Sequence, residues 1–208
     1  QSPQTYKQIL MVAGMDRYFQ IVKCFRDEDL RADRQLEFTQ IDVEMSFVDQ
    51  EDIFTIVEGL MRRFFKQVWN RELQTPLPRL SFDEAMEKYG SDKPDLRFDL
   101  EMKTLNNVFI ETGFKVFKDV TDAGGIITGL LAPGCGEYTR NQLDVLTDFV
   151  KGHGAKGLIW IRVKEGELES PTMKFFSDQE KKTLTETLGA QPGDLIFILT
   201  KKKIKTLN

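Results

Sequence analysis

Residues 20–47, QIVKCFRDEDLRADRQLEFTQIDVEMSF, carry the strongest structural signal in the chain. An apolar run at 21–25 enters a charged segment, and a second run leaves it with period-2 alternation from Ile41 onward, a pattern typical of half-buried strands. Between the runs lie seven charged side chains: Arg26, Asp27, Glu28, Asp29, Arg31, Asp33 and Arg34. Because burying so many charges is costly, we predict a hairpin whose tip faces a polar ligand with phosphates, an amine and a ring.

Composition sets broad limits on the class of protein. The 208 residues correspond to one large domain or two small ones, and 40% apolar with 30% charged residues is ordinary for a soluble protein. No apolar run reaches the roughly 20 residues that span a bilayer, and no secretory signal is present. We therefore expect a cytoplasmic protein that is not associated with a membrane. The net charge of −4 restricts any nucleic-acid contact to a local patch. Because the sequence starts without Met, we expect it to be processed or excised from something longer.

Periodicity and capping signals predict the secondary structure. Ser81 and Ser177 are each followed three residues later by Glu, and Thr139 also suits a helix cap. Gly124-Gly125 predicts a hairpin turn between two strands. The second half thus predicts a two-layer β-β-α-β-α-β unit, with one more helix ahead of it at 105–112. The remaining expected elements are helices at 3–12, 52–69, 81–89, 139–150 and 177–188, and strands at 18–25, 36–49, 114–120, 126–131, 157–163 and 195–200.

The hairpin resembles the second signature motif of class II aminoacyl-tRNA synthetases, which reads Phe-Arg-x-Glu, a loop, and Arg-x-x-x-Phe. The matching residues here are Phe25, Arg26, Glu28, Arg34 and Phe38. The segments QSPQTYKQ at 1–8 and GSDKPDLR at 90–97 narrow the resemblance to bacterial-type aspartyl-tRNA synthetases. The second half is similar to the insertion domain shared by those enzymes and the B subunit of tRNA-dependent amidotransferases, through Gly124-Gly125, APGCGEYTR at 132–140 and GAKGL at 154–158.

The resemblance implies an α+β fold in three parts. Residues 1–100 would be part of a class II antiparallel-sheet catalytic domain, residues 101–200 a two-layer α+β insertion domain, and residues 201–208 a linker returning toward the catalytic half. The family's anticodon-binding barrel and its first and third motifs are not found in this sequence. We therefore expect an internal piece that forms no adenylate by itself.

The implied reaction joins aspartate and ATP into aspartyl-adenylate and then transfers aspartate to tRNA. It brings a carboxylate against a phosphate, and a guanidinium can bridge both anions with its fixed fork. The resemblance gives that catalytic role to Arg26. It places Glu28 at the adenine amine and Phe38 against the adenine ring. It adds three further ATP contacts: Asp27, Arg34 and Gln35.

The resemblance also implies the amino-acid pocket and the tRNA contact. Ser2 and Gln4 would bind the substrate ammonium, and Lys7 the side-chain carboxylate of aspartate. Gln40 and Asp42 would line the same pocket, with Asp42 orienting Lys7 so that an uncharged asparagine leaves a charge unpaired. At the hairpin tip, Leu30 and Arg31 would contact the acceptor end of tRNA. Magnesium is expected to accompany ATP, and no residue of this sequence is named as its ligand. The full enzyme is expected to be a homodimer.

Simpler interpretations stand beside these. Arg26 could be a surface arginine paired with Asp27 or Asp29. Phe38 could be a core aromatic residue of a strand, and the pocket residues could be solvated surface. For the whole chain, the alternative is a non-catalytic, tRNA-associated binding module related to the amidotransferase B subunit.

Overall fold

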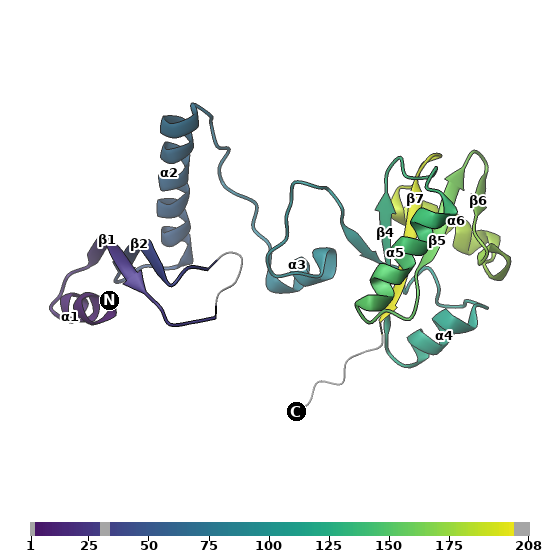
Figure 1. Cartoon of the computed structure of the whole chain (residues 1–208), viewed down its shortest axis with the longest axis horizontal. Coiled ribbons are helices and arrows are strands. Elements are labelled where there is room, and N and C mark those ends of the chain that lie inside the picture. The colour runs from purple at the N-terminus through teal and green to yellow at the C-terminus, as the bar shows by residue number, and fades with distance from the viewer. Residues whose placement is uncertain (1–2, 30–33, 202–208) are drawn as a thin grey trace. The chain divides into compact units, whose positions relative to one another are not determined.

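The computed structural model describes residues 3–29 and 34–201. The chain forms two compact units, Gln1–Pro78 and Arg79–Asn208 (Figure 1). Both sheets are antiparallel, so the fold is of the α+β class. Among the described residues, no helix combines the length and the apolar character needed to cross a membrane.

The first unit contains helix α1 (Gln4–Val12), strands β1 (Arg17–Phe25) and β2 (Glu37–Met45), and helix α2 (Gln50–Trp69). The two strands form an antiparallel hairpin in which Ile21 pairs with Ile41 and Cys24 with Phe38. Helix α1 contacts both strands. The four elements confirm the helices and strands that the sequence predicts here.

Strand β2 is shorter than the predicted strand at 36–49, because the chain turns to start α2. Phe47 has a φ of 59°, in the left-handed region that ends an extended run. The Asp49 carboxylate then caps α2 by accepting from the backbone N–H groups of Glu51 (2.9 Å) and Asp52 (3.2 Å). Residues 46–49 therefore join the two elements rather than extend the strand.

Large apolar side chains of the first unit stay open to solvent. Within its described part, only Cys24 and Asp42 are buried. The apolar stripe of α2 is 40–57% exposed, at Ile53, Ile56, Val57, Leu60, Phe64 and Val68. A two-stranded hairpin has too little surface to cover such a stripe by itself.

The second unit is built on a five-stranded antiparallel sheet in the order β3-β4-β7-β5-β6. Helix α3 (Phe82–Tyr89) precedes the sheet, and Ser81 and Glu84 form its predicted capping box. The strands are β3 (Met102–Thr104), β4 (Ile126–Ala132), β5 (Ile159–Lys164), β6 (Glu167–Glu169) and β7 (Leu195–Lys201). The other helices are α4 (Lys115–Asp122), α5 (Arg140–Gly152), the 3-10 turn η1 (Met173–Phe175) and α6 (Asp178–Leu188).

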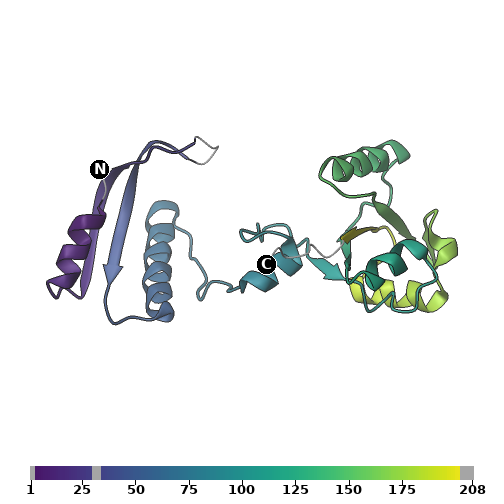
Figure 2. The ribbon, with the colours of Figure 1, turned by 90° about the horizontal axis from the view of Figure 1, so that it is seen from below.

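Helices cover both faces of this sheet, where the sequence predicts only two layers. Helix α5 lies on one face, and α4 and α6 lie on the other (Figure 2). The main core is on the α4 and α6 side, where Phe117 and Leu184 pack with strand residues such as Ile127 and Ile196. Leu143 of α5 is buried outside that cluster. Three layers result because the second face of the sheet is also apolar at its centre, where Phe197 of β7 pairs with Leu130 of β4 and Trp160 of β5.

The strand predicted at 114–120 is wrong. These residues enter α4, in which Phe117 and Val120 are buried at helical spacing while Val116 remains 49% exposed. Valine and phenylalanine favour strands, but here the three-residue spacing decides which side chains reach the core. Gly124-Gly125 accordingly follows a helix and does not join two strands.

The helix predicted at 105–112 is also wrong, because this segment folds as turns anchored by side chains. Leu105 and Phe109 are fully buried. The Asn106 side chain donates to the Gly125 carbonyl and accepts from the Ile127 N–H, each at 2.9 Å. These bonds to a neighbouring strand replace the partners that a helix would supply.

The division into compact units lies ahead of the domain boundary predicted near residue 100. Contacts place α3 with the second unit, where Tyr89 donates to Glu101 at 2.9 Å and Thr104 donates to Glu87 at 3.4 Å. These contacts describe packing and not evolutionary domains. The predicted parts 1–100, 101–200 and 201–208 therefore stay a prediction.

Candidate active site

The two faces of the β1–β2 hairpin differ sharply. The inner face, which lies toward α1, consists of Tyr18, Gln20, Val22, Cys24, Phe38, Gln40, Asp42 and Glu44. The opposite, outer face is 46–72% exposed at Phe19, Ile21, Phe25, Ile41 and Val43. The alternating apolar residues of the sequence thus lie on the exposed outer face, and the polar residues between them lie on the inner face.

Helix α1 brings Lys7 to two carboxylates on the inner face. The Lys7 Nζ lies 3.1 Å from Asp42 Oδ1 and 3.1 Å from Glu44 Oε2. The hydrogen bonds to Asp42 and then Glu44 raise the pKa of Lys7 above its ordinary value, because they favour the charged ammonium. Lys7 and Asp42 are thus in direct contact, and the orienting role of Asp42 stays a prediction.

Asp42 is only 5% exposed, which is unusual for a carboxylate. Its Oδ1 accepts from Lys7, but its buried Oδ2 has no partner among the described residues. A buried acceptor without a donor is costly, so such an atom suits a site that an N–H or O–H group enters. Nearby, Gln40 accepts from the Cys24 thiol at 3.5 Å.

Arg26 and Phe38 lie together at the far end of the same face. The guanidinium carbon of Arg26 is 5.2 Å from the centre of the Phe38 ring, a cation–π distance. The Arg26 N–H also donates to the Leu36 carbonyl at 2.9 Å, which closes the hairpin below the tip. This places a planar cation and an aromatic ring side by side, which suits a phosphate attached to a base.

The comparison with protein families decides the class of protein. The family model of tRNA synthetases class II (D, K and N) matches residues 1–198, nearly the whole chain. The chain belongs to this family.

Curated relatives narrow the likeness within the class II synthetases. The chain is 55% identical over 200 residues to the aspartate–tRNA(Asp/Asn) ligase of Desulfatibacillum aliphaticivorans, which covers 96% of this chain. It is 55% identical over 202 residues to the aspartate–tRNA ligase of Clostridium perfringens, and 56% over 203 residues to the aspartate–tRNA(Asp/Asn) ligase of Aquifex aeolicus, covering 97% and 98% of this chain. In each case the match spans 34% of the relative, so the chain has about a third of its relatives' length.

The other predicted site residues of this synthetase chain that the structure describes lie around the hairpin loop and on α1. Glu28 and Arg34 form an ion pair with each other at the base of the tip. Asp27 and Gln35 are placed with them on the two arms of the loop. Gln4 lies in the first turn of α1, on the same helix as Lys7. Three predicted residues lie outside the described ones: Ser2, Leu30 and Arg31.

Sequence reasoning did not single out Glu44. Its signal is its position two residues after Asp42, which puts both carboxylates on one face of a strand.

Magnesium is a separate matter. Within residues 3–29 and 34–201, no group of three or more His, Cys, Asp or Glu side chains could hold a metal ion.

Two motif glycines of the second unit, Gly125 and Gly136, allow close packing of the backbone. A Cβ at Gly125 would lie 2.6 Å from the Lys201 carbonyl oxygen, and one at Gly136 would lie 2.7 Å from that of Gly193. The Gly136 N–H donates to this Gly193 oxygen at 2.8 Å. Backbone atoms cannot yield as a flexible side chain can, so a Cβ at either position would force the backbone to shift.

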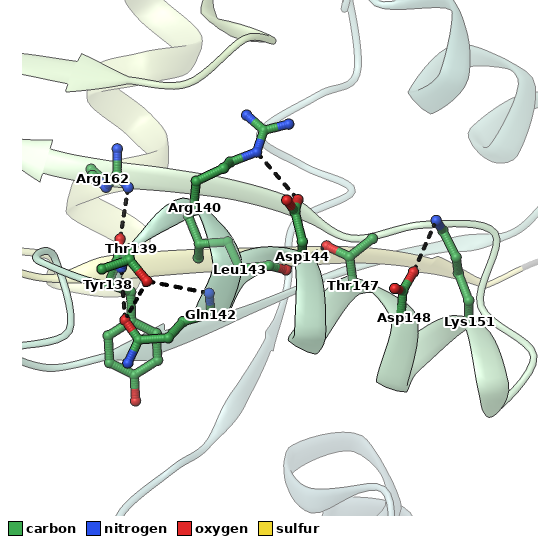
Figure 3. Close-up of polar contacts among 10 residues, drawn as sticks. All are labelled: Tyr138, Thr139, Arg140, Gln142, Leu143, Asp144, Thr147, Asp148, Lys151 and Arg162. Atoms are coloured by element: carbon green, nitrogen blue, oxygen red, sulfur yellow. Dashed lines mark hydrogen bonds and ion pairs between the residues drawn. The ribbon is translucent and has the colours of Figure 1, made fainter.

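Side chains complete the same loop at the start of α5. Arg162 of β5 donates to the Tyr138 carbonyl at 2.7 Å, and Thr139 forms a capping box with Gln142 (Figure 3). Further along α5, Arg140 pairs with Asp144 and Lys151 with Asp148 (Figure 3). These contacts give Tyr138, Thr139 and Arg140 of the motif at 132–140 structural roles.

Proposed function

We propose that this chain forms part of the aspartate- and ATP-binding region of an aspartate–tRNA ligase. The observation that carries the proposal is the inner face of the hairpin, where Asp42 pairs with Lys7 of α1 and Arg26 lies against the Phe38 ring. The Lys7 ammonium suits an anionic side chain, and an arginine over an aromatic ring suits a nucleotide. The names of the relatives fit this chemistry.

The first step would join the two substrates. An aspartate carboxylate oxygen attacks the α-phosphorus of ATP, a P–O bond forms, and pyrophosphate leaves with the electrons of the broken bond. Both reactants are anions, so positioning and charge stabilisation supply most of the catalysis. Arg26 would bridge the carboxylate and the α-phosphate, because its planar guanidinium has several N–H donors in a fixed fork. The compact ammonium of a lysine lacks this fork.

Substrate recognition would use the rest of the inner face. Lys7 would bind the side-chain carboxylate of aspartate, held in place by the buried Asp42. Gln4 and Gln40 would complete this pocket, and Phe38 would stack on adenine. Glu28 and Arg34 pair with each other here, so they would separate to reach the adenine amine and the outer phosphates.

Further parts of the proposal rest on the family alone. Residues 30–33 at the hairpin tip would meet the acceptor end of tRNA, which accepts aspartate in the second step. Residues 101–200 would be the insertion domain, and the whole enzyme would be a cytoplasmic homodimer that uses magnesium with ATP.

Pyrophosphate exchange tests the proposal. In the Aquifex aeolicus enzyme, the 203 matching residues would be replaced by those of this chain, and aspartate-dependent exchange would be measured. Lys7→Met should raise the KM for aspartate about 100-fold, because a charge-assisted bond to the substrate is lost. The control is Lys23→Met, which removes the same charge from the outer face, where Lys23 is 76% exposed.

Two outcomes would count against the proposal. Exchange that depends on an amino acid other than aspartate would assign the pocket to another substrate. An unchanged KM in the Lys7→Met chimera, with the chimera shown to be folded by circular dichroism, would remove Lys7 from the pocket.

A further inference from the structure

We infer that Glu44 is a built-in competitor of the substrate: its carboxylate holds the position on Lys7 that the side-chain carboxylate of aspartate takes. This inference rests on the proposed function and adds a residue that tunes substrate affinity. Binding of aspartate would then be an exchange of one carboxylate for another on a single ammonium group, while Asp42 stays in place throughout.

The contact geometry makes the two carboxylates equivalent partners of Lys7. Both oxygens lie 3.1 Å from the Nζ. An ammonium group has three N–H donors, and these two contacts use two of them. Lys7 is thus already neutralised before any substrate arrives.

Burial distinguishes the two carboxylates. The side chain of Asp42 is 6% exposed and that of Lys7 is 14% exposed, whereas Glu44 is 42% exposed. Asp42 could leave Lys7 only by placing an unpaired charge inside the protein, which is strongly unfavourable. Glu44 can rotate into water at little cost, because half-exposed ion pairs contribute little free energy. Glu44 is therefore the partner that an incoming carboxylate displaces.

Charge balance leads to the same conclusion. Lys7, Asp42 and Glu44 together carry a formal charge of −1. A substrate carboxylate entering beside them would raise this to −2 within a few ångströms, and like charges at that distance repel. When Glu44 turns away to solvent, the substrate restores the original charge around Lys7. A substrate with a neutral side chain forms no ion pair with Lys7, so it cannot compensate for the loss of the Lys7–Glu44 ion pair.

The test is a split between KM and kcat in the same chimeric enzyme. Glu44→Gln removes the competitor and should lower the KM for aspartate about fivefold, with kcat unchanged within about twofold. Glu37→Gln is the matched control, since it removes the same charge from the same strand on the outer face, where Glu37 pairs with Lys23. It should leave both constants unchanged.

A second variant separates competition from a structural role. Glu44→Ala also removes the competitor, so it should lower KM as well, whereas a residue needed to position Lys7 would give a higher KM in both variants. An unchanged or higher KM in the Glu44 variants, with wild-type exchange intact, overturns the inference alone. Failure of the folded wild-type chimera to use aspartate overturns the proposed function instead.

Discussion

Phe117 in α4 offers the sharpest test of the fold, because its neighbour Val116 provides an internal control. Phe117 is fully buried, and its ring centre lies 4.6 Å from that of Phe109 and 5.7 Å from that of Phe176. Val116, on the same helix, is 49% exposed. The substitutions Phe117→Ala and Val116→Ala should therefore differ widely in their effect on stability.

The magnitude follows from burial. Removing a buried phenylalanine side chain costs about 3–5 kcal/mol, since apolar contacts are lost and a cavity remains. Trimming a half-exposed valine costs about 0.5 kcal/mol. With a urea m-value of about 2 kcal/mol per molar, the Phe117 variant should unfold at a midpoint roughly 2 M lower, and the Val116 variant at one roughly 0.3 M lower.

Tryptophan fluorescence can report on the second unit alone. The sequence has two tryptophans, and Trp160 is the one in this unit. In a Trp69→Phe background of the full chain, urea unfolding would be followed through Trp160. A strand at 114–120 would point Val116 and Phe117 to opposite faces, with Val116 aligned with Phe114. A midpoint lowered more by Val116→Ala than by Phe117→Ala would refute the helix and its packing.

Two further predictions concern the second unit. Gly125→Ala should lower the free energy of unfolding by about 1–3 kcal/mol, because its Cβ would overlap backbone atoms, whereas Gly157→Ala has nothing within 4 Å and should change it by about 0.5 kcal/mol or less; equal urea midpoints would contradict this. Arg97, by hydrogen bonding, lowers the pKa of Asp95 from 3.8 to about 2. The stabilisation from this pair should be complete above pH 4 and lost as the pH falls through 2, so Asp95→Asn should weaken the acid dependence of the midpoint, and an NMR titration of Asp95 near 3.8 would contradict the pairing.

Helix starts are the part of the fold that the sequence predicts best. Ser81, Thr139 and Ser177 each begin a helix in the structure, and each forms a capping box with the residue three positions later. Such bonds join residues close in the chain, so they depend little on the rest of the molecule. Amphipathic spacing in α2 is equally local, so the sequence also predicts this helix.

Segments whose partners are distant were predicted poorly. The segment 105–112 is held by Asn106, which bonds across to residues 125 and 127. Phe117 is buried by Phe176, which lies far along the chain. Strands β3 and β6 have three residues each, too few for a period to show. Pairing across the sheet, and not local preference, determines these elements.

At the candidate site, the chemical groups can be read from the sequence, because the resemblance names Arg26, Phe38, Lys7 and Asp42. How these groups combine depends on the folded chain. Lys7 and Asp42 are 35 positions apart, and packing of α1 against the hairpin brings them to 3.1 Å. The same packing adds Glu44 as a second partner, which no motif indicates. A motif identifies the residues, but which charges neutralise one another depends on distances and burial that exist only after the chain has folded.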